Sequence, residues 1–327
     1  MMVLFGIFLL TLLVITAIGI VRAENLFTAV MLTGIFSLLM ASNFFILDAA
    51  DVALTEAAVG AGVSTVLLLG ALALIPSRER PLRSRRWLAL SVVTLTALTV
   101  GYATFENPRL GDPQAPVHQH VAPWYLEQTP LLIEIPNVVT AVLGSYRGYD
   151  TLGEVIVVLT AGIGVLFLLG LPGAFGDRKA EDVARGRTYL SHHLVPQVVG
   201  QLLIPFIMLF ALYVQFHGEY GPGGGFQAGA IFAAAVILFA LIQGEREALV
   251  LIPPRVLVVL MASGALLYGG VGVVGMLLGA NFLDYSVLSS DPVKGQQWGI
   301  ILIELGVGVS VASVLLAIYH AFAARGR

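Results

Sequence analysis

Nine apolar segments, each long enough to cross a membrane, constrain this chain more than any other feature. A transmembrane α-helix needs roughly 20 apolar residues to cover the hydrocarbon core. The runs are continuous and do not alternate between apolar and polar residues, which excludes a transmembrane β-barrel. The sequence therefore predicts an all-α fold, a polytopic transmembrane helical bundle of about nine spans. The expected spans are residues 2–21, 25–47, 51–75, 86–103, 153–171, 194–216, 226–243, 256–280 and 298–320.

The composition agrees with this class of protein. Of the 327 residues, 58% are apolar and 11% are charged, against roughly 25% charged residues in an ordinary soluble domain. A soluble protein of this size keeps a charged surface, so the composition excludes a soluble enzyme and a nucleic-acid-binding protein. The chain has no cysteine, which removes thiolate chemistry, iron–sulfur ligation and cysteine zinc sites. The first apolar segment is too long and lacks the basic start of a signal peptide, so we expect a retained span.

Arginine and lysine predict the orientation, because cytoplasmic loops of membrane proteins are rich in them. Fourteen of the 17 basic residues fall on one side of the nine-span arrangement. They lie in the loops after the first, third, fifth and seventh spans and at the C-terminus. Arg109, Arg147 and Lys294 fall on the other side. We therefore expect the N-terminus outside and the C-terminus in the cytoplasm, in a multi-pass protein of the cell membrane.

The longest polar stretch, residues 104–152, lies on the expected outer side and contains six prolines. Proline rigidifies such a segment and prevents a long helix at its front. Within it, residues 131–146 are half apolar and too short to span. We expect them to lie on the membrane face or to pack between spans.

Ionisable residues inside spans are the main functional signal, because each is costly in lipid unless it is paired or hydrated. The third span opens with Asp51 and reaches Glu56 one and a half turns later, and Asp48 precedes it. The small residues of 57–64 let another helix approach closely, so we expect Glu56 to be buried between helices. A buried carboxyl group can take up and release a proton near neutral pH. Asp51 is equally compatible with a cap of its own helix.

Two further carboxyl groups belong to other spans. Glu154 closes the sequence Thr151-Leu-Gly-Glu154, which is typical of a capping box before an apolar run, and that structural explanation accounts for it. Glu304 lies about two turns past Trp298 inside the ninth span, where no cap is needed, so it is a functional candidate. A structural carboxylate bonded to Ser or Thr of a neighbouring helix is the alternative for Glu304.

A glycine-rich stretch, residues 217–229, joins the sixth and seventh spans. Its glycines and its proline break the helix. Backbone exposed at membrane depth is tolerated only inside protein or beside water. The stretch is therefore either a tight outer hairpin or an unwound segment whose backbone, with His217 and Glu219, borders an ion path.

The ionisable candidates gather in the expected outer half of the membrane or at its outer rim: Asp48, Asp51, Glu56, Glu154, His217, Glu219 and Glu304. This pattern predicts an outer, cation-attracting vestibule, or acids favoured by the dipoles at the N-terminal ends of inward-running helices. No lysine lies inside an expected span, so the chain lacks the buried Lys–Glu relay of a complete proton pump. We interpret His192, His193 and His320, at expected cytoplasmic ends, as polar anchors and predict no metal site.

The glycine-rich segment carries a family resemblance. HGEYGPGGGFQAGAIFAAAVIL closely resembles the signature of the MnhB/MrpB subunit of Mrp-type Na+/H+ antiporters, and the resemblance covers about residues 188–322. Residues 5–75, with DVALTEAAVGAGVSTVLLLGAL, look like the MbhD module, and residues 86–172, with TLGEVIVVLTAGIGVL, look like MbhE. These two modules end the large A-type polypeptide in many Mrp systems and are separate chains in membrane-bound hydrogenases. They are also similar to the NuoJ-type subunit of respiratory complex I.

The resemblance implies three fused modules in a prokaryotic inner membrane: 1–80 (MbhD-like), 81–180 (MbhE-like) and 181–327 (MnhB/MrpB-like). By position, Glu56 matches the acidic residue of the MbhD helix. Glu154 matches the acidic entry of the MbhE helix, which favours a function for it beyond capping. The MnhB/MrpB motif corresponds to Pro222, Gly223, Gly224, Gly225, Phe226 and Gln227.

The resemblance also implies partners, since the chain lacks the large antiporter-like domain of the A-type polypeptide. We expect other Mrp antiporter subunits, of the large A and D types and the small C, E, F and G types, together with membrane lipid and no nucleic acid. No cofactor and no enzymatic reaction are implied, and the transported ions are Na+ and H+.

These observations predict a membrane subunit of a multi-subunit Mrp-type monovalent cation (Na+)/proton antiporter, contributing to the ion path and to subunit contacts. Glu56 would alternate between protonated and ionised states while hydrated Na+ passes nearby. The alternative is a membrane-arm subunit of a redox-driven ion-pumping complex related to membrane-bound hydrogenase or complex I. A purely structural role in a complex is a second alternative. A stand-alone transporter is disfavoured, because no internal inverted repeat is evident.

Overall fold

The structure is a computed structural model that describes residues 2–72, 74–79, 85–109, 111–170 and 194–325. Its elements over these ranges are helices, which confirms the all-α fold class. Nine helical stretches in the described ranges are long and apolar enough to cross a membrane, and the chain is a multi-pass membrane protein.

The nine spans follow the predicted segments closely. They are α1 (Met2–Arg22), α2 (Leu26–Ile46), a composite third span, α5 (Arg86–Thr104), α8 (Gly148–Leu169), α10 (Leu194–His217), α11 (Gly225–Gln243), α13 (Pro254–Leu277) and α14 (Pro292–Arg325). The composite span consists of α3 (Ala50–Glu56), the π-helix η1 (Ala57–Ser64) and α4 (Thr65–Leu72). Two starts were predicted too late, those of α8 and α14, because polar residues precede their apolar runs within the same helix.

Shorter helices connect the spans. They are η3 (Val117–Val121), α6 (Ala122–Leu132), α7 (Val138–Ala141), η4 (Val142–Tyr146), α12 (Glu245–Leu251) and η5 (Tyr285–Leu288). The described residues at the front of the proline-rich stretch, before Val117, form no long helix, as predicted, whereas η3 and α6 then run on continuously to Leu132. Ile133, Ile135 and Ala141 are buried in a core cluster with residues of α8, α13 and α14. Of the two placements expected for residues 131–146, the structure therefore has the one packed against the spans.

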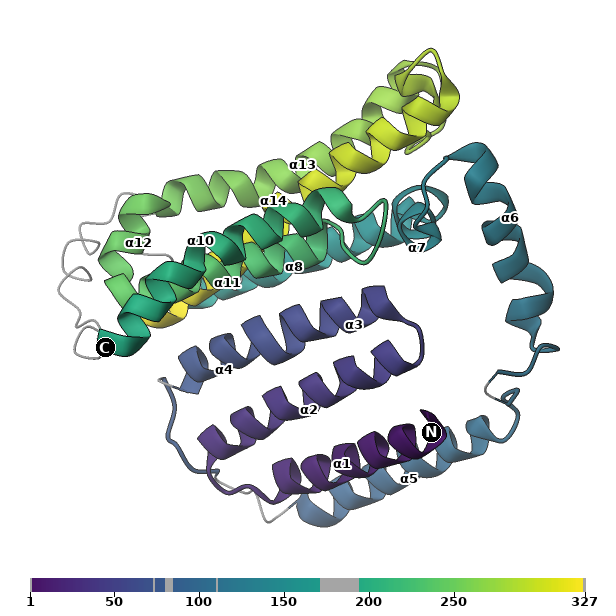
Figure 1. The fold of residues 1–327 in the computed structure, drawn as a ribbon. Coiled ribbons are helices and arrows are strands. Elements are labelled where there is room, and N and C mark those ends of the chain that lie inside the picture. The colour runs from purple at the N-terminus through teal and green to yellow at the C-terminus, as the bar shows by residue number, and fades with distance from the viewer. Residues whose placement is uncertain (1, 73, 80–84, 110, 171–193, 326–327) are drawn as a thin grey trace.

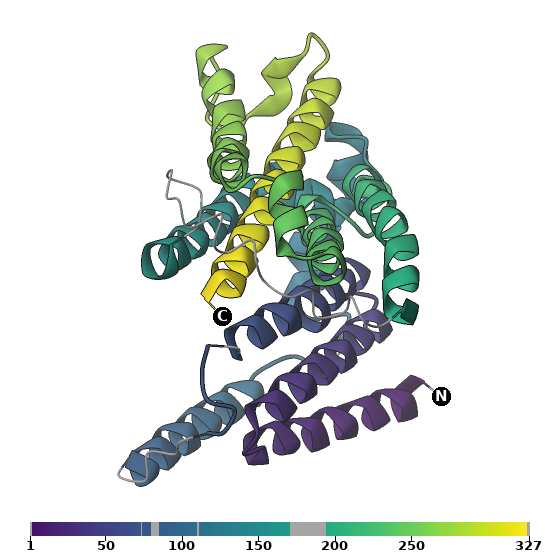
Figure 2. The ribbon, with the colours of Figure 1, turned by 90° about the vertical axis from the view of Figure 1, so that its left-hand side faces the viewer.

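The helices form two groups, joined by contacts of α11 with α3 and η1 and of α14 with α4. Figures 1 and 2 show α1, α2, α3 and α4 on one side and α8, α10, α11, α13 and α14 on the other. In the second group α14 packs against α8, α11 and α13, and α11 also contacts α3 and η1 of the first group. By contrast, none of the residues of α5 is buried.

Glycines bring α13 and α14 into close contact. A Cβ added at Gly264 of α13 would lie 2.6 Å from the carbonyl oxygen of Gly306 on α14 and 2.7 Å from the amide nitrogen of Ser310. Small residues at such crossings let two backbones approach, which is how helices associate in lipid. The glycine content of the chain thus serves helix packing in addition to the turn between α10 and α11.

Described connections that were predicted to share one side of the membrane lie at one end of the helices. The turn from α1 to α2, the end of α4, the connection α12 and the C-terminus lie at one end of the helices, and the N-terminus lies at the other (Figure 1). Seven of the fourteen basic residues that predicted the orientation lie outside the described residues: Arg80, Arg83, Arg178, Lys179, Arg185, Arg187 and Arg327. Which end faces the cytoplasm stays a prediction.

The α13–α14 crossing leads to a matched pair of substitutions. Gly264→Ala places a methyl group against the α14 backbone and should destabilise the protein by about 1–3 kcal/mol, because a packed helix pair must move apart. Gly270→Ala lies on the same helix with no atom within 4 Å of the added Cβ. It should leave the thermal unfolding temperature in detergent unchanged or slightly raised. Equal unfolding temperatures for the two variants would contradict this packing.

Candidate functional site

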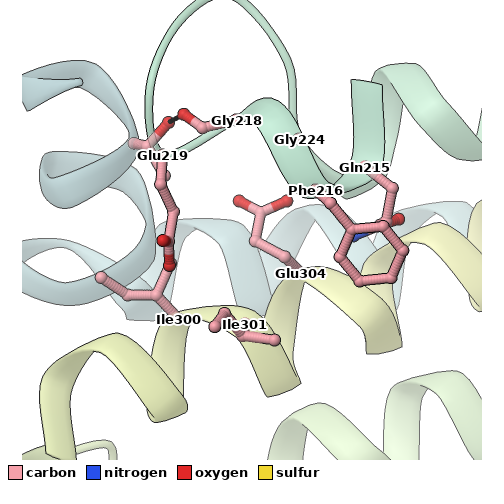
Figure 3. A pocket seen from close by; sticks show the side chains of 9 residues that line it. Gln215, Phe216, Gly218, Glu219, Gly224, Ile300, Ile301 and Glu304 are labelled. Carbon is pink, nitrogen blue, oxygen red and sulfur yellow. Dashed lines mark hydrogen bonds between the residues drawn. The ribbon is translucent and has the colours of Figure 1, made fainter. Parts of the chain in front are cut away.

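A small cavity lies where the turn between α10 and α11 meets α14. Its volume is about 60 Å³, room for about two water molecules. Figure 3 shows Glu219 and Glu304 reaching into it from the turn and from α14. The lining residues are Thr140, Gln215, Phe216, Gly218, Glu219, Gly224, Ile300, Ile301 and Glu304.

The glycine-rich turn builds one wall of this cavity. The α10 helix ends at His217 and α11 begins at Gly225, so the segment is a tight connection between two spans. Gly224 has a φ of +134°, which L side chains rarely adopt, and a Cβ there would lie 2.9 Å from Oε2 of Glu304. At Gly225 an added Cβ would collide with the backbone carbonyl of Glu304. Gly224 and Gly225 are therefore glycine because α14 lies directly against this backbone, whereas at Gly223 an added Cβ would lie 2.6 Å from the carbonyl oxygen of Val214.

Glu304 is held by the same turn. The amide N–H of Gly225 donates a hydrogen bond to Oε2 of Glu304. This amide belongs to the first turn of α11, where N–H groups lack partners within the helix and favour a negative charge. The hydrogen bond that Glu304 accepts thus comes from a backbone amide of α11 and not from Ser or Thr of a neighbouring helix.

Glu219 faces the cavity without such support. Its Oε1 atom is buried and accepts no hydrogen bond from the described part of the chain. Burial raises the pKa of the Glu219 carboxyl group above its ordinary value. The side chains of Glu219 and Glu304 therefore bring two carboxyl groups to one water-sized cavity, one stabilised by an amide and one not.

Other carboxyl groups act on Glu304 from a greater distance. Glu219, Glu154 and Asp51 are all close enough to Glu304 to interact with it electrostatically. None of the nine residues lining the cavity is basic. Because like charges disfavour simultaneous ionisation, this arrangement attracts a proton or a small cation.

Asn137 links three segments: α3, the turn between α10 and α11, and α7, which it caps. Its side-chain Nδ2 donates to Oδ1 of Asp51 (3.2 Å), to the carbonyl of Gly218 (3.0 Å) and to that of Gly221 (2.9 Å). Its backbone N–H donates to the carbonyl of Glu219. Its Oδ1 accepts from the amides of residues 139 and 140 and so caps α7. One side chain thus fixes the backbone on both sides of Glu219.

Two sequence interpretations of helix caps were wrong. Asp51 does not cap α3, because its Oδ1 accepts from Asn137 and from the amide of Gly223 (3.3 Å). Thr151 and Glu154 do not form a capping box, because α8 begins earlier, at Gly148. The Thr151 hydroxyl instead donates to the carbonyl of Leu143 (2.9 Å), and Glu154 is exposed on α8.

Glu56 lies away from the cavity, between α3/η1 and α2. Its carboxylate and the hydroxyl of Ser37 both lie against Gly60, where an added Cβ would come within 2.5 Å of Glu56 Oε1 and 2.7 Å of Ser37 Oγ. The side chain is partly buried, in agreement with the expectation that small residues let a helix approach here. The π-helix η1 begins directly after Glu56, and such π segments are frequent at functional sites.

The remaining candidates are not brought to the cavity. His217 stacks on Tyr213 with 4.6 Å between ring centroids and on Tyr220 with 6.1 Å. Asp48 is exposed in the turn between α2 and α3. Over the described ranges, no group of three or more His, Asp or Glu side chains is placed to hold a metal ion.

Three polar residues of the site were not predicted from the sequence: Thr140 and Gln215, which line the cavity, and Asn137, which holds the turn beside it. The Thr140 hydroxyl donates to the carbonyl of Gly218 (2.7 Å), and Gln215 lies against Gly308 of α14. Two signals were available. Asn137 directly precedes an apolar run, which is the position of an N-cap, and Gln215 is a polar residue in an apolar span.

Two families match parts of the sequence. Residues 195–317 match the family described as a domain related to the MnhB subunit of the Na+/H+ antiporter. Residues 11–77 match the MbhD family, described as the D-type subunit of MBH.

Two relatives differ in how much of the chain they share. A protein of Rhizobium meliloti named as a probable A/B-type K+/H+ antiporter subunit is 28% identical over 89% of this chain and 32% of its own length. A protein of Staphylococcus aureus named as the putative antiporter subunit mnhB2 is 34% identical over 38% of this chain and 90% of its own length.

Two solved structures share the fold. A chain of the Mrp complex from Dietzia sp. DQ12-45-1b has a TM-score of 0.74 and 25% identity, over 96% of this chain and 34% of that chain. A chain of the membrane-bound sulfane sulfur reductase, an archaeal respiratory membrane complex, has a TM-score of 0.55 and 27% identity, over 72% of this chain and 97% of that chain.

The fold and the cavity define a polytopic membrane protein with paired carboxyl groups beside a glycine-rich turn. With the matches above, the chain belongs to the family of proteins related to the MnhB subunit of Na+/H+ antiporters. It spans about a third of the length of the Rhizobium meliloti relative and of the matched Mrp-complex chain.

The contacts of Asn137 lead to a stability prediction. Asn137→Ser keeps an oxygen that can cap α7 but removes the Nδ2 donor. Because buried acceptors then lose their partner, we expect a loss of about 1–3 kcal/mol and faster hydrogen exchange in residues 218–225. Asn107→Ser, at an exposed position, is the control. Unchanged exchange in the turn would show that Asn137 does not hold it.

Glu219 leads to a prediction on the pH dependence of stability. The pKa of Glu219 is higher in the folded than in the unfolded chain. Below the unfolded pKa this group does not destabilise the fold, and the free energy of unfolding falls as the pH rises through the folded pKa. Glu219→Gln should therefore raise the thermal unfolding temperature at about pH 7, and the difference should vanish near about pH 4. If Glu219→Gln and the wild type had equal unfolding temperatures at both pH values, burial would not destabilise the charged form of Glu219.

Proposed function

We propose that this chain is a membrane subunit of a multi-subunit Mrp-type antiporter that exchanges Na+ for protons. Its role is to contribute to the ion path and to the contacts between subunits, and no catalytic reaction or cofactor is assigned to it. Membership of the MnhB-related family supports this function. Similarity to a chain of the Mrp complex over 96% of the sequence supports the multi-subunit assembly.

The observation that carries the proposal is the meeting of Glu219 and Glu304 in one cavity walled by the family's glycine motif. Two carboxyl groups in so small a volume favour one bound positive charge, either a proton or a monovalent cation. When the same carboxyl groups bind both, each occupant displaces the other, and this competition is the basis of exchange. Gln215 and Thr140 also line this cavity.

Each candidate residue has a place in this proposal. Glu304 and Glu219 bind the ion or the proton. Asp51 holds the turn through Asn137, and Glu154 adds negative potential from the α8 side. Glu56 lies in the other helix group and takes up and releases a proton beside the π-helix. Asp48 and His217 form the outer rim of the path.

We further propose the division into modules 1–80, 81–180 and 181–327, with the C-terminus in the cytoplasm. The family matches at 11–77 and 195–317 fall inside the first and third modules and support that division. The expected partners are the A-, D-, C-, E-, F- and G-type subunits of the complex.

Glutamine substitutions test the ion-binding roles in the intact complex. In everted membrane vesicles, Glu304→Gln should lower Na+-dependent proton release by about tenfold or more, the effect of losing an interaction worth about 1.4 kcal/mol. Glu56→Gln should also reduce exchange strongly while the complex still assembles. Glu247→Gln removes an exposed carboxyl group of α12 and serves as the matched control. Normal exchange by an assembled Glu304→Gln complex would refute the cavity as the ion site.

The second candidate function is that of a membrane-arm subunit in a redox-driven ion-pumping complex. The similarity to a chain of the membrane-bound sulfane sulfur reductase favours it, since this chain covers 97% of that one. Purification of the assembled complex separates the two functions. A co-purifying hydrophilic subunit with iron–sulfur or nickel–iron centres would establish the redox-driven complex, whereas antiporter subunits alone would establish the first proposal.

A further inference from the structure

A buried histidine lies at the opposite end of α14 from the cavity. His320 is 1% exposed, and Glu245, the first residue of α12, is 8% exposed. His320 Nδ1 lies 4.0 Å from Oε1 of Glu245. These two residues have no part in the cavity at Glu304.

The surroundings of His320 are apolar. The neighbouring core cluster contains Leu257, Leu316 and Tyr319, and the Tyr319 ring packs edge-on against the imidazole at 5.4 Å. Neither ring nitrogen of His320 forms a hydrogen bond with the described residues. A neutral imidazole always carries one N–H donor, and leaving a buried donor without a partner is costly. Such a group calls for an explanation beyond that of a polar anchor at a helix end.

Glu245 is the acidic group buried beside His320. The other elements packed around this end of α14 are α4 and α11, which contain no ionisable residue, the C-terminal part of α8, whose acidic residues Asp150 and Glu154 lie at its opposite end, and α13, whose Arg255 is exposed. On α12, Arg246 and Glu247 are exposed. On α14, the Arg325 Nε donates to the carbonyl of Leu169. Within the described ranges, the charge that can compensate a protonated His320 is therefore that of Glu245.

The position of the pair relates it to the cavity. Sixteen residues separate Glu304 from His320 on one uninterrupted helix, about 24 Å at 1.5 Å per residue. That length approaches the roughly 30 Å thickness of the hydrocarbon core. One helix thus places a buried ionisable side chain near each face of the membrane.

We propose that His320 and Glu245 form a second proton-binding site, at the end of the bundle opposite to Glu219 and Glu304. A proton that arrives from solution at this end of the bundle binds to a ring nitrogen of His320. Burial opposes a lone imidazolium, and the Glu245 carboxylate compensates it by closing from 4.0 Å to a charge-assisted hydrogen bond. Release of the proton restores the neutral ring. The role of this site in transport rests on the proposed antiport, whereas proton binding itself does not.

Proton binding is tested on the purified intact complex by infrared difference spectra during a pH titration. The wild type should show an imidazolium signal that is absent from His320→Gln. Glu245→Gln leaves the imidazole and its packing in place, and should move the signal to lower pH by about one unit, a tenfold loss of proton affinity. His118→Gln, at an exposed position, should retain the signal. An unchanged titration in Glu245→Gln, or in His320→Gln, would overturn the proposal.

Exchange assays on the same preparations separate this inference from the proposed function. Assembled His320→Gln complexes should lose the pH dependence of Na+/H+ exchange over the range in which the infrared signal titrates. If the signal disappears but the pH profile of exchange stays that of the wild type, the transport role is refuted. If the wild-type complex shows the signal but no cation/proton exchange, the proposed function fails and the proton site remains.

Discussion

The close contact between α11 and α14 at Gly225 is the constraint on which the site depends. The backbone of Gly225 lies against the carbonyl of Glu304, so any side chain at this position would separate the two helices. The same proximity brings the Gly225 amide to the Glu304 carboxylate. The same contact thus serves helix packing and charge stabilisation. α11 approaches α14 closely because its first residue has no side chain. The N–H group of that residue, which has no partner within its own helix, donates to the buried carboxylate. Gly229 continues this contact against Gly308 one turn further along.

Two carboxyl groups of this region, those of Asp51 and Glu304, are supported by neutral dipoles. Asp51 accepts from the amide side chain of Asn137 and from a backbone N–H, and Glu304 accepts from a backbone N–H. Amide donors stabilise a carboxylate without cancelling its charge, so a mobile positive charge can still be attracted to the site. An ion pair with arginine or lysine would hold the same carboxylate permanently neutralised. The arrangement suits a group that must exchange its positive partner.

Much of the fold could be predicted from the sequence, because hydrophobic length alone identifies spans. The nine segments, the helix break before Gly225 and the packed small residues beside Glu56 all follow from local composition. Local composition was misleading where a helix began in polar sequence, as at Gly148, which removed the capping box predicted for Thr151. The partners of Asp51 were also unpredictable, since Asn137 and Gly223 are 86 and 172 residues away along the chain. The cavity itself depends on such distant contacts.

The helix α5 differs from the other spans, because none of its residues is buried within the chain. A helix of this kind inserts by its hydrophobicity, independently of the packing that orders the other spans. The chain therefore imposes no shape requirement on its side chains, only a requirement of length and apolar character. Over long evolutionary times, α5 is free to exchange one apolar residue for another, whereas α14, with its buried glycines, is tightly restricted. Positions of α5 that vary little among related sequences would therefore mark contacts with neighbouring subunits or bound lipid.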